Sequence, residues 1–132
     1  ALSYHRLIPE VSQTVASVTA RRSCVYRTPL GTFGFTRVPM NDPMAGVRTV
    51  KLDRDAWAFV ACPVRAIADL LYVRKREIEE DGGALDVLVR SMRIEREDLD
   101  AIRWDEAEEV LGALRSKKTR RLIEVLRERI AT

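Results

Sequence analysis

The sequence predicts an α+β fold in which short strands precede a set of helices. Apolar segments before Cys62 are short and rich in β-branched and aromatic residues, whereas those after it repeat apolar residues at helical spacing. The two patterns meet in residues 56–72, where a strand-length apolar run passes directly into an amphipathic helix. We therefore expect an N-terminal short helix and a small, mostly antiparallel sheet of about five strands. This sheet would pack against about four C-terminal helices in one domain, residues 1–132.

The first eight residues are already apolar at helical spacing, and Pro9 ends that pattern. No capping residue precedes them. We therefore expect a short helix here, and we expect the chain to be a fragment of a longer protein.

A β-hairpin is the clearest local prediction of the first half. Residues 24–28 and 32–38 are rich in β-branched and aromatic side chains and flank Pro29-Leu30-Gly31, a sequence suited to a turn. Residues 15–19 and 47–52 alternate as strands, and residues 53–55 turn the latter into the next strand.

The strand and helix in residues 56–72 are expected to form the inner layer of the domain. Residues 56–61 are almost entirely apolar, which is typical of a strand buried on both faces. Pro63 suits the first position of a helix, and a stripe of Ala66, Ile67, Leu70 and Leu71 follows. Residues 74–77 continue that helix on a solvated face.

The remaining sequence predicts three more helices and one ambiguous segment. Residues 85–92 form a short amphipathic helix, and residues 97–102 form either a helical turn or a loop. Asp105 can cap a helix over residues 107–114. Ser116 can cap the last helix, whose apolar stripe consists of Leu122, Ile123, Leu126 and Ile130.

Composition favours a soluble cytoplasmic domain without a cofactor. The 132 residues are 46% hydrophobic, enough for a core, and no apolar run approaches the roughly 20 residues that a bilayer crossing needs. There is no signal-peptide pattern. Cys24 and Cys62 are too few for a disulfide framework or a zinc site, so both are expected to be small core residues.

Catalytic constellations are not evident, and the candidate groups have structural interpretations. The single histidine, His5, is expected to pack on the first helix, and no G-x-S-x-G pattern is present. Asp53 and Asp55 are expected to be turn residues rather than metal ligands. Asp69 is expected to be a structural, hydrogen-bonding carboxylate.

The two tryptophans, Trp57 and Trp104, are expected to pack in the core or at an edge rather than to stack on bases.

Basic residues form the most suggestive set. The formal net charge is +3, and the last helix begins with a basic run, where the helix dipole disfavours cations. This placement suggests an anionic partner, although a solvated helix face explains it equally well. The candidate partner-binding or nucleic-acid-binding residues are Arg21, Arg22, Lys117, Lys118, Arg120 and Arg121.

Three segments taken together resemble AbiEi-type antitoxins of abortive-infection toxin–antitoxin systems. They are residues 1–10 (ALSYHRLIPE), 28–35 (TPLGTFGF) and 60–72 (VACPVRAIADLLY). The resemblance implies a winged-helix DNA-binding domain followed by an antitoxin domain, with this chain being the second part. Two departures stand out: Arg6 replaces a frequent glycine, and Val64-Arg65 replaces Glu-Lys, which removes an acidic residue.

By this resemblance the protein is a bacterial transcriptional regulator and not an enzyme. It would counteract a nucleotidyltransferase-like toxin, directly or indirectly, and the full-length protein would repress its own operon by binding inverted repeats in operator DNA. One alternative is a sequence-tolerant DNA-binding domain that uses the basic C-terminal helix. Another, based only on the many carboxylates, is a degenerate nuclease-like enzyme.

Overall fold

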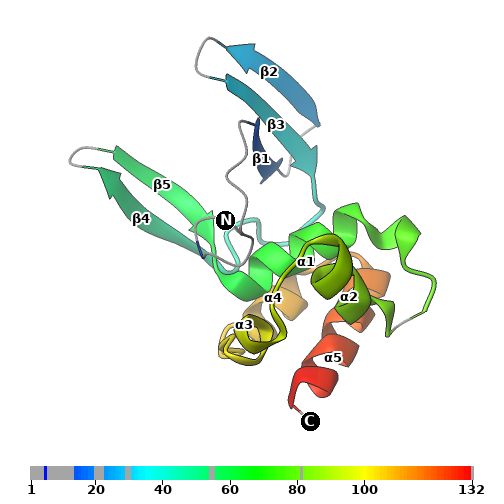
Figure 1. Ribbon diagram of the computed structural model, residues 1–132. Coiled ribbons are helices and arrows are strands. Elements are labelled where there is room, and N and C mark those ends of the chain that lie inside the picture. Colours follow the sequence, from blue (N-terminus) through cyan, green and yellow to red (C-terminus); the bar gives the residue numbers. More distant parts are fainter. Residues whose placement is uncertain are drawn as a thin grey trace.

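The computed structural model describes residues 5, 14–19, 23–28, 31–53, 56–80 and 82–131, and it is an α+β structure (Figure 1). Strands come first: β1 (Thr14–Thr19), β2 (Cys24–Thr28), β3 (Gly31–Arg37), β4 (Val47–Asp53) and β5 (Ala56–Ala61). Helix α1 (Pro63–Val73) and the 3₁₀ turn η1 (Lys75–Glu77) follow. Next come α2 (Gly83–Asp86), the π-helical turn η2 (Val87–Ser91), α3 (Arg96–Asp100), α4 (Ala107–Ala113) and α5 (Lys117–Ala131).

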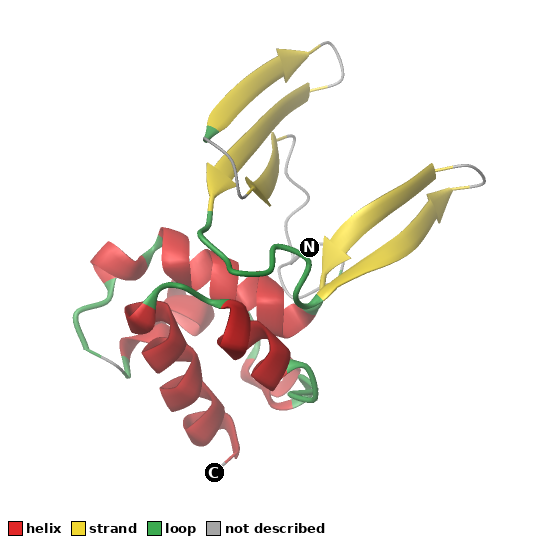
Figure 2. Cartoon of the chain, turned by 180° about the vertical axis from the view of Figure 1, so that it is seen from behind, coloured by secondary structure: helices red, strands yellow, loops and turns green. Residues whose placement is uncertain are grey.

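The strands form two separate sheets rather than the single sheet expected from the sequence. In the first, β3 lies between β1 and β2, parallel to β1 and antiparallel to β2. The β2–β3 pairing confirms the predicted hairpin, although Pro29 and Leu30 at its tip lie outside the described residues. In the second sheet, β4 and β5 form an antiparallel ribbon with a register shift between Lys51 and Asp53. Both sheets project from the helices (Figure 2).

The prediction that β5 is buried on both faces is wrong. Among the described strands, β5 pairs only with β4, and the side chains of Trp57 and Phe59 are 63% and 70% exposed. An apolar run shows that a strand can be buried, but whether a neighbouring layer covers it depends on the tertiary structure. The helix that follows does lie at the centre of the helical core, as expected.

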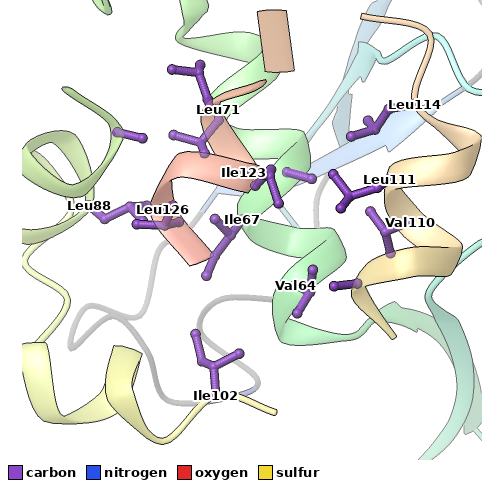
Figure 3. Packing of buried hydrophobic residues seen from close by; sticks show 14 of the residues in the cluster. Val64, Ile67, Leu71, Leu88, Ile102, Val110, Leu111, Leu114, Ile123 and Leu126 are labelled. Carbon is purple, nitrogen blue, oxygen red and sulfur yellow. The ribbon is translucent and has the colours of Figure 1, made fainter. Parts of the chain in front are cut away.

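The core is built by helices and by the loop that follows β3. Apolar side chains of α1, α4 and α5 interdigitate there, including Ile67 of α1, Val110 of α4 and Ile123 of α5, all fully buried (Figure 3). Val38, Met40 and Ala45 come from the loop. None of the strand side chains that the structure describes belongs to this core, so the helices bury their apolar stripes mainly against one another.

Two helices, α1 and α5, begin with the residues that the sequence predicts, and α4 does not. Pro63 is the first residue of α1, preceded by Cys62 as the N-cap. The Ser116 hydroxyl accepts a hydrogen bond from the Thr119 backbone N–H at 3.2 Å, so Ser116 caps α5 as predicted. Asp105 does not cap α4: the N-cap is Glu106, and the Asp105 carboxylate pairs with Arg103 at 2.8 Å.

The predicted N-terminal helix lies outside the described residues except for His5. The Nε2 atom of His5 lies 2.8 Å from the carbonyl oxygen of Ala61, the last residue of β5.

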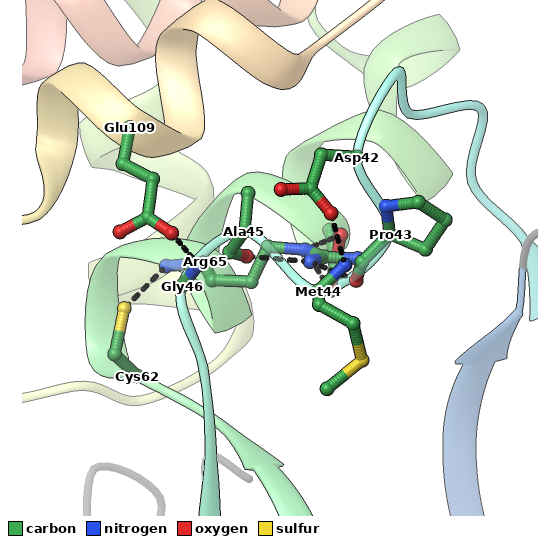
Figure 4. A network of polar contacts seen from close by, with 9 residues as sticks. Asp42, Pro43, Met44, Ala45, Gly46, Cys62, Arg65 and Glu109 are labelled. Carbon is green, nitrogen blue, oxygen red and sulfur yellow. Dashed lines mark hydrogen bonds and ion pairs between the residues drawn. The ribbon is translucent and has the colours of Figure 1, made fainter.

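A buried arginine attaches the loop between β3 and β4 to α1 (Figure 4). Arg65 donates from Nε to the Asp69 carboxylate at 3.0 and 3.2 Å, and from one terminal nitrogen to the carbonyls of Pro43 and Ala45 at 2.8 and 2.7 Å. The side chain is only 4% exposed. This confirms the structural role expected for Asp69, whose pKa is raised by burial, an effect that the charge of Arg65 opposes.

Gly46 closes the same loop where no side chain fits. Its φ is +70°, and a Cβ added there would lie 2.7 Å from Val110 Cγ2 and 2.9 Å from Arg65 Cβ. Its carbonyl accepts a 2.7 Å hydrogen bond from the Cys62 N–H, and its own N–H donates to the Glu109 carboxylate at 3.4 Å. The loop therefore sits directly on α1 and α4.

Gly46→Ala should lower the free energy of unfolding by about 2–4 kcal/mol, because left-handed strain and overpacking add together. The matched control is Gly112→Ala in α4, where an added Cβ meets no atom within 4 Å. That change should raise stability by about 0.5–1 kcal/mol, as expected for alanine replacing glycine in a helix. Urea unfolding of both variants measures the difference, and equal stabilities would contradict the tight packing around Gly46.

Arg65→Met should destabilise the fold by about 3–5 kcal/mol, because it leaves the buried Asp69 carboxylate without its cation. The double variant Arg65→Met/Asp69→Leu should recover only part of that loss, since the Pro43 and Ala45 carbonyls stay unpaired. Urea unfolding of the single and double variants gives the comparison. A double variant as stable as the parent would show that the carbonyl contacts contribute nothing.

Candidate nucleic-acid interface

Of the binding residues predicted from the sequence, the structure describes those in the basic run at the start of α5. Lys117, Lys118 and Arg121 are exposed, and Arg120 is half-buried. Arg21 and Arg22, the other two candidates, lie outside the described residues.

Arg120 faces the interior of the helical body. Its Nε donates to the Leu111 carbonyl at 3.1 Å, and a terminal nitrogen donates to the Leu114 carbonyl at 2.8 Å. These carbonyls lie at the C-terminal end of α4, where helical backbone acceptors lack intrahelical partners. Arg120 therefore has a structural role that the sequence pattern did not reveal.

A second basic segment lies beside the first one. Lys118 Nζ donates to the Lys75 carbonyl at 2.6 Å, which brings the start of α5 against η1. Lys75 Nζ lies 3.9 Å from the centre of the Tyr72 ring, and Arg76 is exposed. We define the basic surface as Lys75, Arg76, Lys117, Lys118 and Arg121.

The electrostatics of this basic surface favour an anion. The first turn of α5 contains no acidic residue, so its cations add to the positive end of the helix dipole. On the η1 side, Glu77 lies 3.8 Å from Arg74, which partly offsets the local charge. Cations beside a helix N-terminus attract anions, phosphate groups among them.

Among the residues that the structure describes, the other groups considered from the sequence do not assemble into a reactive centre. Asp53 is the last residue of β4, and Asp55 lies outside the described residues. Trp104 packs against the core, whereas Trp57 does not. Within the described ranges, no three His, Cys, Asp or Glu side chains are grouped so that they could hold a metal ion, and no helix is long and apolar enough to cross a membrane.

Cys62 has the properties of a protonated thiol. Partial burial and the neighbouring Glu106 carboxylate raise the pKa of Cys62 to about 11. The thiol is therefore protonated at neutral pH, unlike a catalytic cysteine, whose pKa is lowered.

No protein-family model, no curated protein and no solved structure matches the chain.

Arg120→Gln should destabilise the fold by about 1–3 kcal/mol, because two carbonyls at the end of α4 lose their donors. Lys117→Gln removes the same charge from an exposed position and should stay within about 0.5 kcal/mol of the parent. Thermal and urea unfolding of both variants test whether the two cations have different roles. Equal losses would contradict the internal role of Arg120.

Proposed function

We propose that this chain is the antitoxin domain of an AbiEi-type transcriptional regulator and has no catalytic activity of its own. In this role it counteracts a nucleotidyltransferase-like toxin, and the full-length protein represses its own operon. The three segments quoted above support the proposal. Two of them coincide with the β2–β3 hairpin and the β5–α1 junction, and the first lies outside the described residues except for His5.

The observation that carries the regulatory part of this proposal is the basic surface. It joins cations from two segments more than 40 residues apart in sequence, held by the hydrogen bond between Lys118 and Lys75. Contacts to phosphates position a protein on a duplex without reading its sequence. The basic surface would thus add affinity for operator DNA, while the sequence would be read elsewhere in the full-length protein.

The same surface also favours the second candidate function, a sequence-tolerant DNA-binding domain. The two functions differ in their dependence on a toxin. An antitoxin restores growth to cells that express its toxin, whereas a DNA-binding domain alone does not.

The test uses the full-length protein in cells that express the toxin encoded beside it, with growth and activity of the operon's own promoter as readouts. Restored growth together with repression is the expected result. Repression without restored growth would favour the second candidate, and failure of both would refute the proposal.

The basic surface is tested by measuring DNA affinity against salt concentration. In Lys75→Gln/Lys117→Gln, the slope of log K against log salt should fall by roughly 0.9 for each phosphate that the protein no longer neutralises. Arg90→Gln/Arg103→Gln removes the same charge from two exposed arginines elsewhere, each paired with a nearby aspartate, and should change the slope little. Equal effects of the two double variants would show that net charge alone is responsible.

A further inference from the structure

One cation of the basic surface lies against the ring of a tyrosine in α1. The Nζ atom of Lys75 is 3.9 Å from the centre of the Tyr72 ring, well within the roughly 6 Å over which a ring face attracts an ammonium group. Tyr72 is half-buried and packs against the hydrophobic core, so its ring has a fixed place in the helical body. The ring therefore holds the charged end of the Lys75 side chain.

The backbone of Lys75 is held as well. Its carbonyl accepts the 2.6 Å hydrogen bond from Lys118 Nζ, which ties η1 to the start of α5. This bond uses one donor of the Lys118 ammonium, and an ammonium has further donors for another acceptor. Lys75 is thus held both at its carbonyl and at its ammonium, beside a second cation from a distant segment.

Restraint of this kind favours binding to an anion. A lysine side chain loses much conformational freedom when it is fixed on a ligand, and a side chain that is already positioned avoids part of that loss. An ammonium that lies over a ring keeps its charge, and the side that faces away from the ring can still meet an anion. The contact with Tyr72 therefore positions Lys75 without neutralising it.

The carboxylates that follow Lys75 in sequence make this restraint more important. Glu77 lies 3.8 Å from a neighbouring arginine, Glu79 and Glu80 are exposed, and Asp81 lies outside the described residues. Without the ring, the long side chain of Lys75 would be free to pair with one of these carboxylates, and such a pair would compete with an anionic partner. The ring contact works against that competition.

We propose that Tyr72 is a positioning residue of the basic surface: its ring holds the Lys75 ammonium where this ammonium contacts a phosphate of DNA. The inference rests on the proposed function, in which the basic surface binds the backbone of operator DNA. It adds that an uncharged side chain of α1 raises the affinity for DNA without touching the DNA. Because Tyr72 acts through Lys75, its contribution disappears when Lys75 loses its charge.

The experiment is a double-mutant cycle on the affinity of the full-length protein for a duplex that contains the operon's own promoter, at about 50 mM salt, where phosphate contacts are strong. Tyr72→Leu should lower the affinity about two- to fivefold, the size expected for one exposed cation–π contact. Tyr72→Phe keeps the ring and should preserve the affinity. In the Lys75→Gln background, Tyr72→Leu should have no further effect.

Folding is controlled separately, because Tyr72 also packs against the core. Urea unfolding shows whether each variant is folded under the conditions of the binding assay. Tyr72→Met also lacks the ring and has a flexible apolar side chain that fills irregular gaps in a core, so it replaces Tyr72→Leu in the cycle if that variant unfolds.

The possible outcomes separate the inference from the proposed function. Equal losses of affinity on Tyr72→Leu with and without Lys75 would mean that the ring only supports the fold, and equal affinities of the leucine and phenylalanine variants would mean that the ring has no role. A higher affinity after Tyr72→Leu would mean that the ring withholds Lys75 from DNA. Each of these results overturns the inference alone. A salt slope that stays unchanged in Lys75→Gln/Lys117→Gln refutes DNA binding by the basic surface, and the inference fails with it.

Discussion

The hydrogen-bonded guanidinium of Arg65 is the interaction on which the arrangement of this domain depends. It reaches from α1 to Asp69 one turn along and to the carbonyls of Pro43 and Ala45 in the loop that leads into β4. Removing a charge from water is costly, and a cation stays buried only where a carboxylate and further acceptors offset that cost. Here the acceptors belong to α1 and to the loop that precedes β4, so satisfying one side chain also sets where the ribbon leaves the helical body. Gly46 is required at the same place because α1 and α4 leave no room for a Cβ.

Two arginines, Arg65 and Arg120, point towards the helical body for a physical reason, whereas other arginines such as Arg76 and Arg121 are exposed. Arg65 and Arg120 each satisfy two backbone carbonyls, which a planar guanidinium with several fixed donors can do. The lysines at the start of α5 are exposed; Lys118 donates to one carbonyl, and an ammonium can make further contacts. The basic run at the start of α5 therefore contains a structural residue, Arg120, as well as exposed ones. Here the geometry of the acceptors assigns Arg120 to the fold and leaves the neighbouring lysines to the surface.

The features that the sequence predicts correctly are those that depend on neighbouring residues. The hairpin around Pro29-Leu30-Gly31, the start of α1 at Pro63 and the Ser116 cap each follow from local turn or capping chemistry. The separation of the strands into two sheets and the exposure of Trp57 and Phe59 depend on which layers meet, and an apolar run such as residues 56–61 does not specify that. In the candidate site, too, some residues are evident from the sequence and others are brought in by the tertiary structure. Lys117 and Lys118 are evident as a basic run, but Lys75 and Arg76 join them only because η1 packs beside α5, and no local pattern marks Arg65 as buried.

The base of the β4–β5 ribbon is held to the helical body through both of its strands. The Cys62 N–H donates to the Gly46 carbonyl where the two strands meet the body, Glu109 accepts from the Gly46 N–H, and Arg48 pairs with Glu106. These contacts attach both strands to α1 and α4, so the folded chain alone sets the direction of the ribbon. Gly46 directly follows Ala45, whose carbonyl accepts from the Arg65 guanidinium. The network that buries Arg65 therefore also fixes the point at which the ribbon leaves the helical body.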